Sequence, residues 1–221
     1  MGGDKAPAEI VAGAKQAAAE GIPVLLVGPA DLADRGDLEL LVATEVIGMD
    51  EDAASSVKKK KDSTLVRCAE AVRDGKASAM ISAGNTGATM ASALLRMGRA
   101  EGVKRPAIAT PIPVPGSTPT ILLDAGANAE VEAPWLTQFA VMGSVFSTAR
   151  YGIAKPKVGL LSIGEEPGKG DSLRKEAFEL LSAEKSINFV GNVEGRDIMT
   201  TEVDVVVTDG FTGNVALKSL E

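Results

Sequence analysis

The residues best suited to chemistry in this sequence lie in glycine-containing turns that follow apolar segments. Gly168-Lys169-Gly170 places an ammonium between glycines before an expected helix, and Thr212-Gly213-Asn214 places a hydroxyl and an amide in another turn. A lysine adds positive charge to the anion-binding start of a helix, and Thr212 and Asn214 can donate hydrogen bonds to an oxyanion. Both turns favour anion chemistry, although glycine-rich charged loops also form for solvation alone.

A third turn, Ser82-Ala83-Gly84-Asn85-Thr86-Gly87, lies between an expected strand and an expected helix. Its glycines let the backbone approach a ligand closely, and the free N–H groups of the helix start then face that ligand. The turn therefore predicts a site for phosphate or another anion. It is not a Walker loop, because the Gly-Lys-Ser/Thr ending is absent. An ordinary turn capped by Asn85 or Thr86 is the alternative.

Acidic residues end two of the expected strands. Asp124, followed by Asn128, can hold a cation, an amide or a helix N–H group, and it can equally be a turn or cap residue. Asp209 follows Val203-Asp204-Val205-Val206-Val207, an almost fully apolar strand that we expect at the centre of the sheet. In open α/β sheets, ligands bind in a cleft beyond the carboxyl ends of the strands. The turn after this central strand is therefore expected to face the middle of that cleft.

Two further turns carry both charge signs. Glu165 and Glu166 precede Lys169, so the adjacent carboxylates can orient its ammonium. Glu194 and Arg196 lie in the turn after another apolar strand, and we expect them to pair with each other.

Composition excludes several classes of function. The 221 residues include no histidine, which rules out imidazole-based triads and histidine metal sites, and one cysteine, Cys68, which rules out Cys-cluster zinc within the chain. With five Phe, one Tyr, one Trp and a net charge of −7, the chain is a poor candidate for nucleic-acid binding. We expect no metal and no cofactor. Cys68 is expected to be a core residue.

Two basic stretches stand out in this acidic chain. Lys58-Lys59-Lys60-Lys61 is a compact positive run, and Arg96, Arg99, Lys104 and Arg105 form a second one. Such runs are usually solvated faces, and the alternative is a docking surface for an acidic partner.

The chain alternates apolar runs with amphipathic stretches, which predicts an α/β fold with a mostly parallel sheet covered by helices. We treat 1–221 as a single domain with a lobe boundary near 111–119, where prolines cluster and indicate a rigid connection or an edge strand. The expected strands are 24–27, 41–46, 79–82, 107–112, 120–124, 158–163, 187–193 and 203–208. The expected helices are 8–20, 63–74, 86–97, 133–151, 171–183 and one from 211 onward.

Taken together and in this order, the turns resemble the PlsX family, the bacterial phosphate acyltransferases of phospholipid synthesis. The resemblance runs over essentially the whole chain. It rests on the segments Met1-Gly2-Gly3-Asp4-Lys5-Ala6-Pro7, Ser82-Ala83-Gly84-Asn85-Thr86-Gly87-Ala88, Leu122-Leu123-Asp124-Ala125-Gly126-Ala127-Asn128, Gly159-Leu160-Leu161-Ser162-Ile163-Gly164-Glu165-Glu166, Asn188-Phe189-Val190-Gly191-Asn192-Val193-Glu194 and Thr208-Asp209-Gly210-Phe211-Thr212-Gly213-Asn214-Val215.

The resemblance implies a three-layer α/β/α sandwich like that of isopropylmalate dehydrogenases and phosphate acetyltransferases. It also implies the reaction of acyl-[acyl carrier protein] with inorganic phosphate, in a homodimer that associates loosely with the membrane. Relative to that family, the chain is expected to lack an N-terminal strand and a C-terminal segment, the latter resembling a region of membrane contact. Composition and the lack of a visible signal peptide favour a cytoplasmic protein.

For this reaction we expect Lys169 and Asn214 to be the catalytic residues. A thioester is already activated and phosphate is already anionic, so the protein must position phosphate and stabilise an oxyanion. Asp209 and Glu165 are expected to orient Lys169 and the loops rather than to take a proton. The expected substrate-binding residues are Gly84, Asn85, Thr86, Gly87, Asp124, Asn128, Glu165, Asp209 and Thr212.

Two alternatives remain at the level of sequence. One is a phosphate acetyltransferase-like enzyme that uses acyl-CoA. The other is a non-catalytic module that binds phosphate or acyl carrier protein.

Overall fold

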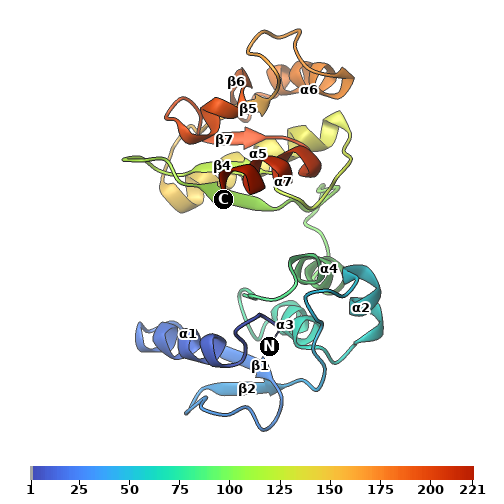
Figure 1. The fold of residues 1–221 in the computed structure, drawn as a ribbon, viewed down its shortest axis with the longest axis vertical. Helices are drawn as coiled ribbons and strands as arrows, with labels where there is room; N and C mark the ends of the chain where they lie inside the picture. The colour runs from blue at the N-terminus through green and yellow to red at the C-terminus, as the bar shows by residue number, and fades with distance from the viewer. Residues whose placement is uncertain (1) are drawn as a thin grey trace. The chain divides into compact units, whose positions relative to one another are not determined.

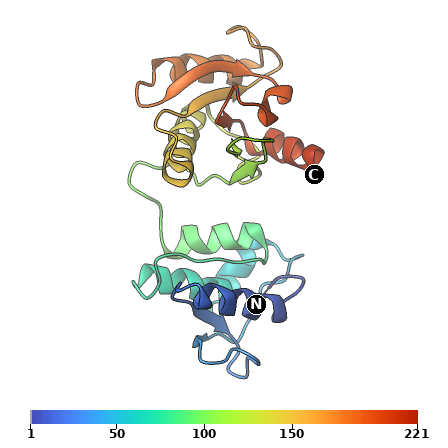
Figure 2. The same cartoon turned by 90° about the vertical axis from the view of Figure 1, so that its left-hand side faces the viewer.

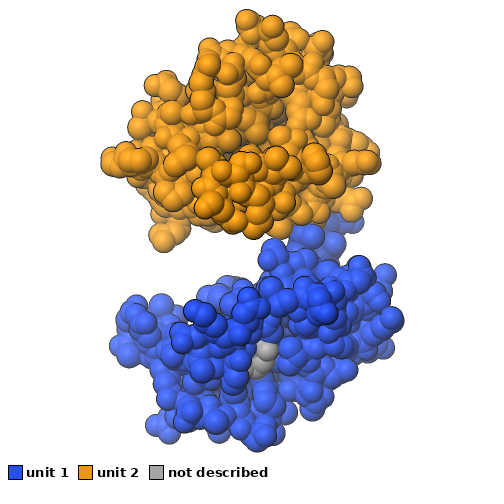
Figure 3. Space-filling view, in the orientation of Figure 1, with its two compact units in different colours: residues 1–101 blue, residues 102–221 orange. Residues whose placement is uncertain are grey.

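The computed structural model describes residues 2–221, which form two compact units divided between Glu101 and Gly102 (Figure 3). The division lies before the segment 111–119, where the sequence suggested a lobe boundary. That segment belongs to the second unit, because Ala109–Ile112 forms a strand that pairs with Thr120–Leu123. Its prolines therefore shape an edge strand and its connection, as the alternative interpretation of this segment predicted.

The first unit combines a short parallel sheet with four helices (Figure 1). Its elements are α1 (Ala8–Ala19), β1 (Leu25–Gly28), β2 (Glu39–Val42), α2 (Ala53–Lys59), α3 (Thr64–Arg73) and α4 (Thr86–Arg96). Helix α4 packs against both α2 and α3 around a buried cluster made of Ile47, Val57, Leu65, Val66 and Ala88. A second cluster of Val11, Leu26 and Leu32 joins α1 to the sheet.

One local prediction in this unit is wrong, and one helix was not predicted. Residues 79–82, expected as a strand, have no strand partner among residues 2–221, and Ile81 is 94% exposed there. A strand needs a neighbour for its N–H and C=O groups, which an apolar run alone does not supply. Conversely, α2 was not expected, although its N-cap carried the signal: Asp52 accepts a hydrogen bond from the Ser55 N–H at 2.9 Å.

The second unit is built on a five-stranded sheet in the order β3-β4-β7-β5-β6. The strands are β3 (Ala109–Ile112), β4 (Thr120–Leu123), β5 (Lys157–Leu161), β6 (Asn188–Val193) and β7 (Val205–Val207). β3 is an antiparallel edge strand, and the other four strands run parallel to one another. The fold is therefore α/β with a mostly parallel sheet, as predicted.

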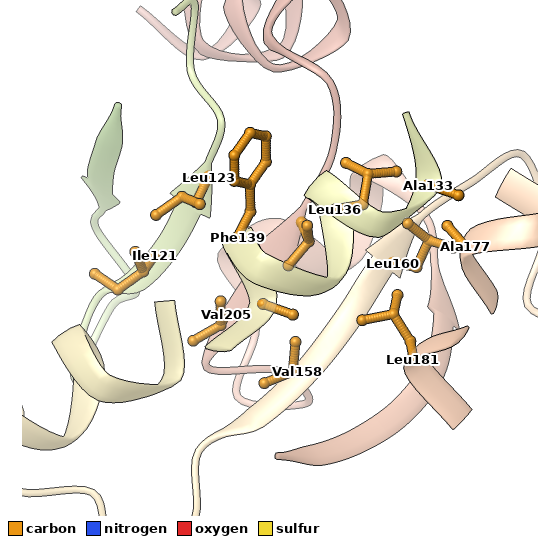
Figure 4. Packing of buried hydrophobic residues seen from close by; sticks show 12 residues of the cluster. Ile121, Leu123, Ala133, Leu136, Phe139, Val158, Leu160, Ala177, Leu181 and Val205 are labelled. Atoms are coloured by element: carbon orange, nitrogen blue, oxygen red, sulfur yellow. The ribbon is translucent and has the colours of Figure 1, made fainter. Parts of the chain in front are cut away.

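Helices cover both faces of this sheet (Figure 1; Figure 2). They are α5 (Ala133–Tyr151), α6 (Ser172–Ala183) and α7 (Gly210–Leu220), with a 3-10 turn at Gly195–Met199. Because side chains alternate along a strand, Ile121 and Leu123 pack toward α5 and α6, whereas Leu122 belongs to the cluster on the α7 face. Figure 4 shows the first of these clusters, with Phe139 of α5 placed over the strands.

The parallel strands end at one edge of the sheet. β7 lies between β4 and β5, and its three valines are fully buried. The turns that follow β4, β5, β6 and β7 therefore leave from the same edge. These turns are 124–128, 162–171, 194–197 and 208–214, which carry most of the candidate site residues.

The loop at 48–51 in the first unit depends on a carboxylate. Glu51 accepts hydrogen bonds from the Gly48 N–H at 2.7 Å, from the Ser56 hydroxyl at 2.7 Å and from the Lys60 ammonium. Lys60 also donates to the Val46 carbonyl at 2.8 Å. The Lys60 ammonium, the Gly48 N–H and the Ser56 hydroxyl together lower the pKa of Glu51 to about 2.

We predict that Phe139→Ala destabilises the second unit by about 3–5 kcal/mol, because it opens a cavity at a fully buried position. Phe146→Ala, on the same helix but 37% exposed, should cost less than about 1 kcal/mol. Trp135 is the single tryptophan and packs against this core, so its fluorescence during urea unfolding reports on this unit. Equal losses in the two variants would contradict the packing described.

We predict that Glu51 remains ionised well below the usual carboxyl pKa of about 4.3. Its contribution to stability is present above that value and is lost as the pH falls through about 2. The Gly48 amide shift should therefore titrate near pH 2 in an NMR series. Lys60→Met should move this midpoint upward, and Lys58→Met, on the exposed face of α2, should not. If the Gly48 amide of the unaltered chain titrates with a midpoint near pH 4, the pKa of Glu51 is not lowered as described.

Candidate functional site

The turn before α4 is organised by Asn85. Its Oδ1 accepts a hydrogen bond from the Ala88 N–H at 2.9 Å, which caps the helix. Its Nδ2 donates to the carbonyls of Gly48, Met49 and Glu51 at 3.1–3.2 Å. The Asn85 side chain is thus committed to the fold, as the capped-turn alternative predicted.

Backbone groups of the same turn remain available. The N–H groups of Thr86 and Gly87 have no hydrogen-bond acceptor among residues 2–221. Glycine is required where the N-terminal loop crosses this turn, since a Cβ on Gly3 would lie 2.8 Å from the Ala83 carbonyl oxygen. The turn therefore offers two amide donors at a helix start, the arrangement that binds anions.

In the second unit, the turn after β4 is held by one buried carboxylate. Asp124 is fully buried and accepts hydrogen bonds from the backbone N–H groups of Ile108, Gly126, Ala127 and Asn128 at 2.8–3.1 Å. The Asn128 side-chain amide adds another at 2.8 Å. Because its two oxygens already have five donors, Asp124 shapes the turn, and Asn128 assists it by also donating to the Pro106 carbonyl.

Asn214 lies against that turn. It sits in the first turns of α7, and its Nδ2 donates to the Ala125 carbonyl oxygen at 3.3 Å. Gly126, at φ 138°, allows this approach, because a Cβ there would lie 3.1 Å from Nδ2. A side-chain amide has two N–H donors, so Asn214 keeps one for a ligand.

The start of α7 is closed by Asp209. This N-cap residue accepts hydrogen bonds from the Thr212 N–H and hydroxyl, both at 2.8 Å, and forms an ion pair with Arg174. Burial raises the pKa of Asp209, but the hydrogen bonds from Thr212 and the Arg174 charge outweigh it and lower the pKa below its ordinary value. Asp209 therefore remains an anion that organises the turn.

Arg174 was not identified from the sequence. It comes from α6, and its contacts to Thr208, Asp209 and Thr212 span more than thirty positions of the chain. The only local signal was the preceding Asp171, the N-cap of α6, which pairs with it at 3.0 Å.

Lys169 is exposed in the loop between β5 and α6, and its ammonium has no acidic partner within ion-pair distance in the described part of the chain. The prediction that Asp209 and Glu165 orient the Lys169 ammonium is wrong, whereas the prediction that they orient the loops is confirmed. Asp209 binds Arg174, and Glu165 binds Arg196 at 2.9 Å. These guanidiniums offer several fixed donors to a carboxylate, and Lys169 therefore remains available to a ligand.

The expected pairing of Glu194 with Arg196 is confirmed at 3.2 Å. Arg196 also reaches Glu165, so it links the turns after β5 and β6. The Glu165 carboxylate is thus involved in loop-to-loop contact across this edge of the sheet.

A pocket of about 650 Å³ opens beside the starts of α6 and α7. Its lining mixes apolar and charged side chains, namely Ala129, Glu130, Val131, Asp171, Leu173, Arg174, Asp209, Phe211 and Thr212. Among residues 2–221, no group of three or more Cys, Asp or Glu side chains is placed to hold a metal ion.

The length and hydropathy of each helix show whether it could cross a membrane. Within the described range 2–221, no helix combines the length and apolar character needed to cross a membrane.

The basic stretches are only partly free. Lys60 is bound to Glu51 and Val46, whereas Lys58, Lys59 and Lys61 are exposed. In the second stretch, Arg96 lies 3.8 Å from Glu70, and the Arg105 guanidinium stacks over the Trp135 ring at 4.9 Å. The exposed part of the lysine run is therefore the stronger candidate for docking.

Solved structures share the overall fold. A EutD phosphotransacetylase from Staphylococcus aureus superposes with a TM-score of 0.67 at 19% identity, covering 96% of this chain and 78% of its own. A phosphotransacetylase from Streptococcus pyogenes gives a TM-score of 0.70 at 18% identity, covering 95% and 76%. At this identity the likeness establishes the fold, which agrees with the predicted architecture.

Sequence relatives are much closer. The phosphate acyltransferase of Nitratidesulfovibrio vulgaris (strain DP4) is 48% identical over 231 aligned residues, covering the whole of this chain and 67% of that protein. The phosphate acyltransferase of Elusimicrobium minutum is 56% identical over 187 residues, covering 85% of this chain and 54% of its own. The family described as fatty acid synthesis protein matches residues 1–221. Because the family model matches its whole length, and because its relatives named phosphate acyltransferase are 48% and 56% identical to it, this chain belongs to the fatty acid synthesis protein family.

Proposed function

We propose that this chain transfers a fatty acyl group from acyl-[acyl carrier protein] to inorganic phosphate, giving acyl phosphate and the free carrier thiol. Its phosphate acyltransferase relatives support acyl transfer to phosphate. The observation that carries the proposal is in the second unit, where Lys169 has no acidic partner in the described chain and Asn214 retains an amide donor. Such donors suit a reaction whose main requirement is to stabilise an oxyanion.

The chemistry balances without a protein nucleophile or an imidazole base. A phosphate oxygen attacks the thioester carbonyl carbon, and the carbonyl oxygen becomes an oxyanion. When this intermediate collapses, the C–S bond breaks and the thiolate of the carrier leaves, later taking a proton from water. Phosphate is already an anion near neutral pH, so the protein has to position it and to stabilise negative charge.

Roles are assigned within each unit by itself. In the first unit, the Thr86 and Gly87 N–H groups at the start of α4 are proposed as an anion site of that unit. In the second unit, Lys169 supplies positive charge and Asn214 donates a hydrogen bond to the oxyanion. Asp124, Asn128 and Asp209 shape the turns that present these groups. Asn85 shapes the turn before α4 in the same way.

The partners beyond phosphate are part of the proposal. We propose acyl carrier protein as the acyl donor, a homodimer as the assembly, and a cytoplasmic location with peripheral membrane contact.

The direct test is to incubate the chain with acyl carrier protein thioester and phosphate and to follow the product by ³¹P NMR. We expect an acyl phosphate resonance that depends on both substrates. Product from acetyl-CoA with none from the carrier thioester would instead support the phosphate acetyltransferase-like alternative. Binding of either substrate with no product would support the non-catalytic alternative.

We predict that Lys169→Ala and Asn214→Ala each lower kcat by about 10²–10³, the usual cost of losing one oxyanion donor. Lys175→Ala and Asn188→Ala are matched controls, since both side chains are exposed on the same unit. They should leave kcat unchanged. Normal turnover in both Lys169→Ala and Asn214→Ala would remove the assigned roles.

We predict that the double reversal Lys58→Glu and Lys59→Glu raises the KM for acyl carrier protein several-fold and leaves the KM for phosphate unchanged. The carrier is acidic, so its attraction to this exposed run is electrostatic and screened by salt. Reversing Lys155 and Lys185, exposed on the second unit, is the control for net charge. If both double variants raise the KM for the carrier equally, this run is not a docking surface.

A further inference from the structure

Arg174 forms four side-chain hydrogen bonds at the carboxyl edge of the second unit's sheet. Its guanidinium is largely buried, with 12% of the side chain exposed. Nη2 donates to the Thr208 and Thr212 hydroxyls at 3.2 Å and to the Asp209 carboxylate, while Nη1 donates to Asp171 at 3.0 Å. The Arg174 guanidinium thus donates to four side chains, one at the start of α6 and three at the end of β7 and the start of α7.

These contacts join the starts of two helices. Arg174 and Asp171 belong to the start of α6, directly after the loop that carries Lys169. Asp209 and Thr212 belong to the start of α7, directly before Asn214. The loop also approaches Arg174 closely, since a Cβ on Gly170, at φ 101°, would lie 2.6 Å from the Arg174 Cβ.

The surroundings argue against Arg174 as a phosphate ligand. The pocket that it lines also contains the carboxylates of Glu130, Asp171 and Asp209. Three acidic groups against one guanidinium leave net negative charge, which repels a phosphate dianion. The bonds of Arg174 also run to protein acceptors, so its geometry is that of a link within the fold.

We propose that Arg174 is a positioning residue, which locks the first turn of α7 to the start of α6 and so holds Asn214 and the Lys169 loop in their working geometry. This inference rests on the proposed acyl transfer to phosphate. A guanidinium suits the task because its planar fork reaches several acceptors at once, whereas an ammonium is a single compact charge.

Loss of this link should act through Asp209. Without Arg174, the buried Asp209 carboxylate loses its counter-charge, which favours its protonated form and loosens its hold on Thr212. The first turn of α7 would then sample more than one arrangement. A displacement of about 1 Å at a reacting group can cost about 10²-fold in rate.

The kinetic test compares Arg174→Met with Lys175→Met, its neighbour on the exposed face of α6. We expect Arg174→Met to lower kcat about tenfold to a hundredfold while the KM for phosphate changes less than about threefold. Arg174→Lys should recover part of the loss, and Lys175→Met should match the unaltered chain. Unchanged kcat in Arg174→Met would overturn the proposal. A rise in the KM for phosphate as large as the loss in kcat would also overturn it, in favour of direct phosphate binding.

A second readout does not depend on turnover. In ¹³C NMR the pKa of the Asp209 carboxyl should rise in Arg174→Met, and the Asn214 side-chain amide signals should shift or broaden. Neither should change in Lys175→Met. If the unaltered chain makes no acyl phosphate, the proposed function fails while these spectra still decide whether Arg174 holds the turn. Identical spectra in both variants would overturn the positioning role.

A folding defect is separated by a double variant. If Arg174→Met does not fold, Arg174→Met combined with Asp209→Asn removes both charges and leaves an amide that can still cap α7. We expect this double variant to fold and to have a kcat about tenfold to a hundredfold below that of the unaltered chain. Full recovery of kcat would overturn the proposal, because it would show that the link is dispensable.

Discussion

The parallel pairing of β7 with β4 and β5 is the constraint on which the second unit depends. β7 is buried on both faces and fixes the register of its neighbours. Its Val206 pairs with Leu122 of β4 on one side and with Gly159 of β5 on the other. Parallel strands end on the same edge, so the turns that carry Asp124, Lys169 and Asp209 leave from one side of the sheet. The location of the proposed site therefore follows from the packing of the sheet.

The charges at this edge are divided between structure and chemistry. Asp124 is saturated by N–H donors and Asp209 is paired with Arg174, so both carboxylates are used to build turns. The groups left available are donors, the Lys169 ammonium and one N–H of Asn214. The buried carboxylates of Asp124 and Asp209 are thus satisfied by protein donors, which leaves the Lys169 ammonium and one Asn214 N–H free to face an anion.

Much of the fold follows from local patterns in the sequence. The helix Ala133–Tyr151 and the strand Asn188–Val193 were predicted almost to the residue, because runs rich in apolar residues and glycine or proline punctuation mark their limits. Residues 79–82 were misassigned because strand formation depends on a partner, which the local sequence does not contain. Glycine-rich turns revealed Lys169 and Asn214, whereas Arg174 gave no such signal, since its role depends on contacts to residues far along the chain.

The central claim is direct attack by phosphate on the thioester, with no covalent acyl-protein intermediate. Mass spectrometry of the carrier and of the chain, after mixing them in equal amounts without phosphate, tests this most directly. Direct attack predicts that the carrier keeps its acyl group until phosphate is added, and that the mass of the chain does not change. Stoichiometric deacylation of the carrier without phosphate, with a matching gain in the mass of the chain, would contradict it.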